Sequence, residues 1–376
     1  MRVEILSDRP VTPNLVAGNA GVACAFPQSA LLANGDVACF YRQGTTKHSH
    51  DGILMLQTSA DMGLSWSEPR LVYDGLAGAP PQTAVSGGIC QTKEGTLFAI
   101  FSTVEGLLPG VYMFSEEGNR CPRHVFALRS RDYGRTWSAP QKVRLNTFPS
   151  YGITTKPFVL PTGELFIPIE VQTLAGAQST FITFSRDDGR TFDPLVTCAD
   201  DPTGTFSLCD ARFTFLPDGR LLTLLWTFVV KTEETIEVRS AFSSDAGRTW
   251  TPPQSTGILG QITMPLALSS GLVIAASNYR WPPDGIRLWH SLDGGTTWDA
   301  RSAIQMWDVQ ASQVLGESVD VRPATAPAED VWQALGRFTF GTPDLVALPD
   351  GSILLTYYAT IQQIIHVRAC RFLVWE

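Results

Sequence analysis

The sequence predicts an all-β fold, a six-bladed β-propeller, from two repeated signatures and from its composition. The first signature is the motif Ser-x-Asp-x-Gly-x-Thr-Trp, which occurs five times with small changes at its last two positions. The second is an apolar run, an x-Gly turn and another apolar run, which occurs six times. Hydrophobic residues make up 44% of the chain and charged residues 17%, which is typical of a folded protein with a large core.

The five motif copies have the spacing of propeller blades. Their aspartates lie 48 to 71 residues apart, which is the length of a four-stranded blade. Each copy follows an apolar run such as 53–56 or 181–184. The copies are Ser59–Trp66, Ser130–Trp137, Ser185–Phe192, Ser243–Trp250 and Ser291–Trp298.

The chemistry of the motif favours a structural role. We expect its Asp to accept hydrogen bonds from backbone amides two and three residues further on and so to close a tight turn. The Gly supplies the positive φ of that turn. The final Trp or Phe offers a large apolar surface to a neighbouring sheet. We therefore interpret the five aspartates as structural and not catalytic.

The six x-Gly turns predict one hairpin for each blade, because two apolar runs joined by such a turn are typical of paired strands. Six hairpins and five motif copies imply that the sixth blade lacks the motif. In chain order the turns are Asn34-Gly35, Glu94-Gly95, Thr162-Gly163, Asp218-Gly219, Ser270-Gly271 and Asp350-Gly351.

The two ends of the chain are expected to meet in the sixth blade. The final strand-like run, 364–374, needs an outer partner, and 2–6 is the unassigned strand that can supply it. We therefore expect one domain over residues 1–376, with its N-terminal strand closing the last blade. The connection 301–338 includes 328–336, which suits a short helix or a lid.

Composition excludes several classes of protein. A net charge of −8 and a pI near 5.2 argue against a nucleic-acid binder. The N-terminus lacks the apolar segment of a signal peptide, and no run of 18 apolar residues suggests a membrane span. Seven cysteines without close pairs favour a reduced, cytoplasmic chain, unless a leader has been removed. We expect no cofactor and no metal; the oligomeric state stays open.

The hairpin turns give the blades a common register. With the residue before each turn Gly as zero, strand alternation predicts that positions −8 and −6 share one face, at the end of the blade opposite the motif turns. Position +8 returns to the same end. Position −8 reads Phe26, Ser86, Thr154, Asp210, Ile262 and Thr342. Position −6 reads Gln28, Gly88, Lys156, Arg212, Met264 and Asp344. Position +8 reads Arg42, Ser102, Glu170, Trp226, Asn278 and Tyr358.

Charges inside apolar strands need partners or a solvated cavity. One interpretation is a set of ion pairs that plug the axis, such as Asp210 with Lys156, or Asp344 with Gln28 and Arg42. The other is a ligand pocket. Its expected binding residues are Gln28, Arg42, Lys156 and Arg212, with Trp226 and Tyr358 as surfaces for ring stacking.

The first-blade loop adds a further cluster, His48-Ser49-His50-Asp51. A solvated loop tip and a metal site are the two interpretations of this cluster, and the first is favoured. We also include His48 among the expected substrate-binding residues.

The repeated motif resembles the Asp-box, or BNR, repeat of the sialidase superfamily, and the resemblance covers nearly the whole chain. It implies a six-bladed propeller of sialidase-like topology with its site at the axis. It also implies a glycan or glycoside as ligand and a carbohydrate-active function.

Several positions that are functional in that superfamily hold other residues in this chain. The stretch that matches its first arginine is Ala25-Phe26-Pro27-Gln28, its second arginine falls on Trp226, and Arg280 is the nearest candidate for the third. The nucleophilic Tyr falls on Thr342 and its Glu partner on Tyr358. Two positions agree in character. Asp210 falls where the superfamily has a Glu, and Asp51 lies in the loop that carries its acid/base Asp. We therefore expect negligible turnover of α-sialosides.

These residues predict a glycoside hydrolase that acts on another sugar, with Asp210, Asp51, Glu170 and Asp344 as catalytic carboxylates. Lys156 and Arg212 are expected to keep Asp210 ionised as base or nucleophile. Asp51 is then the expected acid. A non-catalytic glycan- or peptide-binding propeller and a polysaccharide lyase are the alternatives.

Overall fold

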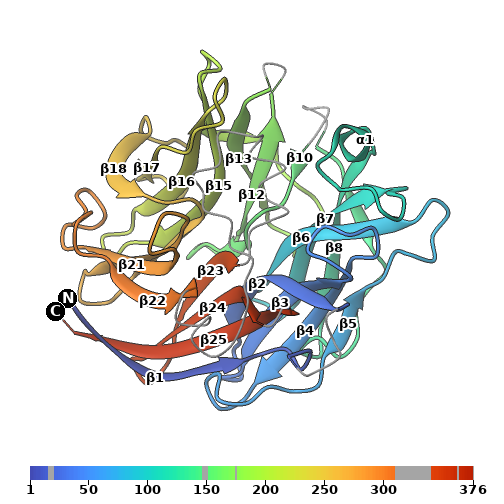
Figure 1. Ribbon diagram of the computed structural model, residues 1–376, viewed down its shortest axis with the longest axis horizontal. Coiled ribbons are helices and arrows are strands. Elements are labelled where there is room, and N and C mark those ends of the chain that lie inside the picture. The colour runs from blue at the N-terminus through green and yellow to red at the C-terminus, as the bar shows by residue number, and fades with distance from the viewer. Residues whose placement is uncertain (16–20, 146–150, 174–175, 310–339, 362–363, 376) are drawn as a thin grey trace.

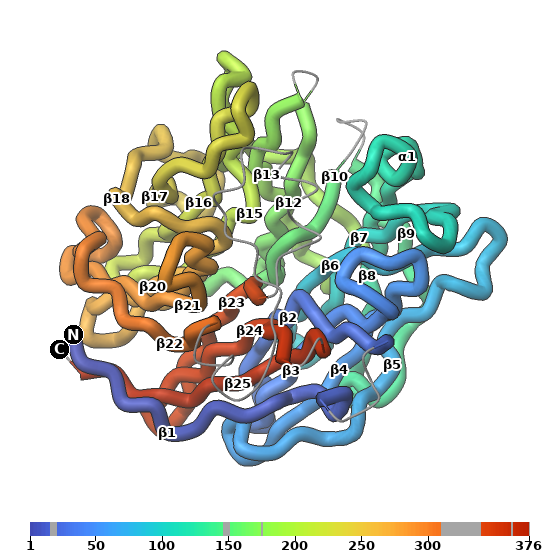
Figure 2. The backbone as a smooth tube through the Cα atoms, viewed as in Figure 1, coloured from blue at the N-terminus to red at the C-terminus, as the bar shows by residue number. Residues whose placement is uncertain are grey.

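The computed structural model describes residues 1–15, 21–145, 151–173, 176–309, 340–361 and 364–375. Six antiparallel sheets form a ring around one axis, with the inner strand of each sheet near the centre (Figure 1). The chain follows the ring in order from the first blade to the last (Figure 2). The prediction of an all-β, six-bladed propeller is confirmed.

Each of blades 1 to 3 runs from an inner strand to an outer one. The inner strand of blade 3 is broken, because two short strands, β10 and β11, both pair with β12. Blade 1 contains β2 (Ala23–Leu31), β3 (Val37–Gly44), β4 (Ile53–Ser59) and β5 (Arg70–Tyr73). Blade 2 contains β6 (Gln82–Gln91), β7 (Leu97–Glu105), β8 (Arg123–Ser130) and β9 (Gln141–Val143). Blade 3 contains β10 (Tyr151–Gly152), β11 (Phe158–Val159), β12 (Leu165–Gln172), β13 (Gln178–Ser185) and β14 (Val196–Ala199).

Blades 4 to 6 repeat this arrangement, and the outer strand of blade 6 is the N-terminal β1. Blade 4 contains β15 (Phe206–Phe215), β16 (Leu221–Val229), β17 (Glu237–Ser243) and β18 (Gln254–Leu259). Blade 5 contains β19 (Thr263–Ala267), β20 (Val273–Tyr279), β21 (Gly285–Ser291) and β22 (Ile304–Asp308). Blade 6 contains β23 (Phe340–Ala347), β24 (Ile353–Ile361), β25 (Ile364–Trp375) and β1 (Arg2–Pro10).

Strand β1 pairs antiparallel with β25 along the rim of the ring (Figure 1). Its Asp8 carboxylate accepts hydrogen bonds from Arg368 Nε at 3.0 Å and from the Tyr357 hydroxyl at 3.2 Å. The pairing joins the two ends of the chain and leaves β1 as the edge strand. The segment 328–336, for which the sequence suggests a helix or lid, lies outside the described residues.

Blade 2 carries an insertion of residues 106–122 between β7 and β8, which contains the short helix α1 (Glu116–Asn119). Ser115 caps this helix by accepting a hydrogen bond from the Gly118 amide. No helix in the described part of the chain has the length and apolarity to span a bilayer.

The five motif turns, the Asp boxes, share one hydrogen-bond pattern. In each, the Ser hydroxyl donates to the Asp carboxylate and accepts from the Gly amide. Asp132 Oδ1 accepts from the amides of Arg135 at 3.1 Å and Thr136 at 2.9 Å, and Oδ2 accepts from the Thr136 hydroxyl at 2.6 Å. The bonded amides are therefore three and four residues on, not the predicted two and three, because the box wraps a wider turn around the carboxylate.

The Gly of each Asp box packs against the preceding blade. Its φ is positive in all five copies, from 74° to 90°. A side chain at Gly189, Gly247 or Gly295 would strike a buried residue on the second strand of the preceding blade, and one at Gly134 would strike Leu56 on the third strand of blade 1. Gly63 of blade 1 meets Leu354 of blade 6 in the same way, so this contact also closes the ring.

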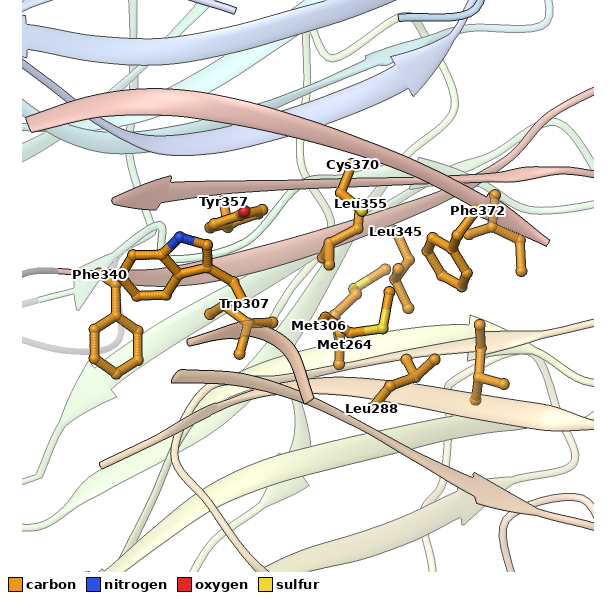
Figure 3. Packing of buried hydrophobic residues seen from close by; sticks show 14 of the residues in the cluster. Met264, Leu288, Met306, Trp307, Phe340, Leu345, Leu355, Tyr357, Cys370 and Phe372 are labelled. Carbon is orange, nitrogen blue, oxygen red and sulfur yellow. The ribbon is translucent and has the colours of Figure 1, made fainter. Parts of the chain in front are cut away.

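Apolar side chains fill the space between neighbouring blades. Figure 3 shows the cluster between blades 5 and 6, where Trp307 packs against Phe340 with ring centroids 5.3 Å apart. The box residue Trp250 likewise contacts Phe166 of blade 3, as the interpretation of the motif requires. The charged residues near the axis therefore lie inside a ring that is otherwise apolar between its sheets.

A pair of glycine substitutions in blade 4 tests the packing role of the box. Gly247 and Gly219 both have φ of +87°, but a side chain at Gly247 would strike Phe166, whereas one at Gly219 meets open space. Gly219→Ala carries only the cost of the left-handed backbone, roughly 1–2 kcal/mol. Gly247→Ala adds overpacking of roughly 1–3 kcal/mol. Urea denaturation measures both, and equal losses of stability would contradict the packing role.

Candidate active site at the propeller axis

A cavity of about 320 Å³ lies at the axis, at the end of the blades opposite the hairpin turns. All six residues at position −8 line it, and five of the six at position +8 do so. The register read from the turns therefore places this cavity correctly. The residues at +8 are Ser102, Glu170, Trp226, Asn278 and Tyr358, and Arg42 is the exception.

Bulges in the inner strands aim the −8 side chains at the axis. The pairing register shifts in β2, β6, β15 and β23 at this position. Three of the −8 residues, Phe26, Asp210 and Thr342, have φ of 59°, 48° and 49°. Such values are uncommon for residues other than Gly and are strained for a β-branched Thr. Bulges of this kind re-aim side chains next to functional sites.

Positions −8 and −6, which simple alternation predicts to share a face, are separated by the bulges in blades 1 and 6 and by the break between β10 and β11 in blade 3. Of the −6 residues, Arg212 lines the cavity, whereas Gln28, Lys156 and Asp344 do not. Lys156 Nζ instead lies 2.8 Å from the Asp344 carboxylate and donates to the Ser29 carbonyl at 2.8 Å. This ion pair lies across the axis. The interpretation of the charges as an axial plug is therefore correct for these two residues, with different partners from those predicted.

Two carboxyl groups meet on the wall formed by blades 3 and 4. Glu170 Oε2 accepts a hydrogen bond from the Asp210 backbone amide at 2.9 Å and from the Thr154 hydroxyl at 3.2 Å. The Asp210 carboxylate lies 3.6 Å from Arg212 Nη2. These are the two carboxyl side chains among the described residues that line the cavity.

Burial favours the protonated form of both carboxyl groups. Burial, followed by the negative charge of Asp210, raises the pKa of Glu170 from 4.5 to about 7. Burial also raises the pKa of Asp210, and Arg212 opposes that rise. Lys156 is bound to Asp344 and so does not act on Asp210 as predicted, whereas Arg212 does favour the ionised form of Asp210 against the effect of burial. Glu170, without a direct cation partner, is the better proton donor.

A cluster of three polar side chains lies on blades 5 and 6. Gly341 has a φ of +152°. A Cβ atom at this position would lie 3.0–3.2 Å from three polar atoms: Asn278 Nδ2, Arg280 Nη2 and the Tyr358 hydroxyl. Arg280 Nε donates to Gln261 at 3.1 Å, and the guanidinium stacks over Phe340 at 4.1 Å. The positive φ favours glycine here, and a side chain would push these three groups aside by a few tenths of an ångström.

Arg42 and Asp51 form the scaffold of the first-blade loop and do not line the cavity, contrary to prediction. Arg42 is 1% exposed and donates to the carbonyls of Ala84, Thr46 and Ser49 at 2.6–2.8 Å. Asp51 accepts from the amide and hydroxyl of Thr45. Burial raises the pKa of Asp51, but hydrogen bonds from Ser49 and Thr45 outweigh it and lower the pKa to about 2. Asp51 is therefore an ionised loop anchor and not the expected acid.

The same loop carries His48 to the cavity wall. His48 is 8% exposed, so the interpretation of this cluster as a solvated loop tip is wrong for His48. Burial, with the nearby charges of Lys47, Arg42 and Arg123, keeps its pKa well below the usual value. In the described residues no group of three His, Cys, Asp or Glu side chains is placed to hold a metal ion.

Seven predicted residues therefore lie together around the cavity: His48, Glu170, Asp210, Arg212, Trp226, Arg280 and Tyr358. Trp226 and Tyr358 are each 3% exposed and do not present open ring faces for stacking. The cavity is also lined by residues that were not predicted from the sequence: Phe114, Asn119, Arg123 and Tyr151. The first two lie in the insertion of blade 2, whose length was the one available signal.

The carboxyl pair predicts a pH-dependent stability. Because the pKa of Glu170 is about 7 when folded and its ordinary value is 4.5, the folded protein holds this proton more tightly than the unfolded chain. The resulting stabilisation is complete below the ordinary value and is lost as the pH rises through the folded one. We expect the wild type to lose more thermal stability between about pH 5 and about pH 8 than Glu170→Gln. Parallel melting curves for the two proteins would contradict the raised pKa.

Comparison with known proteins shows which structures share this fold. The family of BNR repeat-like domains matches residues 99–259. No curated protein matches the chain. A protein of unknown function from Dyadobacter fermentans has a TM-score of 0.75 at 19% identity, with 99% of both chains covered. The intramolecular trans-sialidase from Ruminococcus gnavus has a TM-score of 0.68 at 14% identity, again over 99% of both chains.

A further relative is longer than this chain. The Hadza microbial sialidase Hz136 has a TM-score of 0.68 at 16% identity, with 93% of this chain and 65% of that chain covered. At these identities the similarity shows a shared fold and not a shared activity.

Proposed function

We propose that this chain, a sialidase-like BNR-repeat propeller, is a glycoside hydrolase that acts on a sugar other than ordinary sialic acid. The observation that carries the proposal is the pair of carboxyl groups of Glu170 and Asp210, which both line a cavity large enough for a small ligand, with Glu170 held by the Asp210 backbone amide. Glycoside cleavage needs one carboxyl that gives a proton and one carboxylate that stabilises charge or activates water.

The electrostatics support distinct roles for the two members of the pair. With its pKa raised to about 7, Glu170 holds a proton that it can give to the glycosidic oxygen as the C–O bond breaks. Asp210, next to Arg212, is the member that ionises more readily and can take the proton of the attacking water. The Thr154 hydroxyl hydrogen-bonds both Glu170, at 3.2 Å, and Asp210, so the proton can return from Asp210 to Glu170 through it.

The absence of the superfamily's arginines supports a sugar other than sialic acid. Trp226 lines the cavity at the position of the second carboxylate-binding arginine of sialidases, and the stretch Ala25-Phe26-Pro27-Gln28 that matches the first contains no arginine. Thr342, at the position of the nucleophilic Tyr, is 4% exposed. The bidentate recognition that arginine gives a carboxylate is lost at two positions.

A non-catalytic glycan-binding propeller is the second candidate. The observation that favours it is that both carboxyl groups come from adjacent blades, whereas hydrolases place them on opposite sides of the bond. The two candidates predict different results in the same assay.

The test is a panel of aryl glycosides and oligosaccharides, including an α-sialoside, assayed with purified protein. We expect turnover of a neutral glycoside and negligible turnover of the sialoside. On the glycoside identified, Glu170→Gln and Asp210→Asn should each lower kcat about a hundredfold or more.

Asp51→Asn is the control, because Asp51 is a carboxylate of the first-blade loop that does not line the cavity. It should leave kcat within about threefold of wild type, below the hundredfold effect of a lost acid or base. If Glu170→Gln and Asp210→Asn keep more than about a tenth of the activity, the assignment is wrong. Saturable glycan binding without turnover would favour the binding propeller.

A further inference from the structure

An aromatic wall closes the cavity on the side of blades 1 and 2. It consists of Phe26 on the bulge of β2, His48 on the first-blade loop and Phe114 on the insertion of blade 2. The ring centroids lie 5.2 Å apart for Phe26 and His48 and 4.9 Å apart for His48 and Phe114. Tyr112 packs edge-on behind His48 and Phe114. Three separate segments of the chain therefore build one continuous aromatic surface.

The support beneath this wall is rigid. Arg42 holds the loop of His48 through two backbone carbonyls, and the Thr83 hydroxyl donates to the His50 carbonyl. Under Phe114, a small core of Val85, Val104, Leu107 and Met113 packs the insertion against its blade. The wall is thus formed before any ligand arrives, which lowers the cost of binding.

Arg123 and two serines on this side of the cavity are engaged with the protein itself, whereas the buried Nδ1 of His48 has no hydrogen-bond partner among the described residues. Arg123 donates to the Met113 carbonyl at 3.1 Å and lies over the Phe114 ring at 5.2 Å. The Ser86 hydroxyl donates to the Ile153 carbonyl, and Ser102 accepts from the Ile153 amide. His48 stays neutral at ordinary pH. The wall therefore presents mainly apolar ring surface, opposite in character to the carboxyl pair across the cavity.

We propose that the aromatic wall is a subsite for an aromatic leaving group, so that the substrates are aryl glycosides with the sugar at Glu170 and Asp210. This inference rests on the proposed function, since it assigns the group beyond the cleaved bond. A flat aromatic group stacks on such a surface and gains both buried apolar area and ring contacts. An alkyl or hydroxylated leaving group gains less of either.

The experiment uses 4-methylumbelliferone, a flat aromatic leaving group without a sugar, so that binding is measured without turnover. Fluorescence titration of the purified full chain should give saturable binding at one site. Phe114→Leu should weaken this binding about tenfold, which is the effect of losing one good ring contact with its area. His48→Ala removes a second ring of the same wall and should also weaken the binding of the probe.

Phe126→Leu is the matched control, because Phe126 lies on β8 of the same blade and packs against Phe101 away from the cavity. It should bind the probe as the wild type does. Thermal melting of each variant establishes that it is folded. Absence of probe binding, or equal binding by the wild type, Phe114→Leu and His48→Ala, would overturn the aromatic subsite. Probe binding that depends on the wall, in a protein that hydrolyses nothing in the glycoside panel, would keep the subsite and reject only the hydrolase.

Discussion

The close contact between each Asp-box glycine and the preceding blade is the constraint on which the ring depends. The box presents bare backbone to a buried side chain of that blade, from Leu56 in blade 1 to Leu222 in blade 4. The contact of Gly63 with Leu354 completes the circle. Because the contact leaves no room for a methyl group, it sets the spacing of neighbouring sheets at one end of the propeller. The carboxylate and hydroxyl bonds of the box serve to hold that glycine in place.

The opposite end of the blades is free of this constraint, and there the inner strands depart from regular pairing. Bulges put Phe26, Asp210 and Thr342 into left-handed backbone at equivalent positions of blades 1, 4 and 6. Strain of this kind is retained only where the surrounding structure holds it. Side chains near the axis therefore fall into two sets. Those at position −8 face the cavity, and Lys156 and Asp344, both at position −6, form an ion pair across the axis.

Charged residues near the axis fall into two groups according to what neutralises them. Arg42 and Asp51 are bound by the backbone and hydroxyl groups of one loop, so their charges hold that loop in place. Glu170 and Asp210 lie beside one another with a single nearby guanidinium, so one of them favours a proton. A carboxyl that gains or loses a proton near neutral pH is suited to acid–base chemistry, whereas an anchored carboxylate is not.

The sequence by itself determined the fold class, the number of blades and the register that brings positions −8 and +8 to the axis. It could do so because box turns, x-Gly hairpins and strand alternation are local signals repeated at a fixed spacing. It did not determine which charges face the cavity. A bulge adds one residue to a strand and reverses alternation without a clear sequence signal, so Gln28 and Asp344 were misplaced. Lys156 was misplaced because it lies in the break between β10 and β11. Loop geometry decided the rest: His48 and Phe114 reach the cavity, and Asp51 does not, because contacts between distant segments of the chain fold these loops.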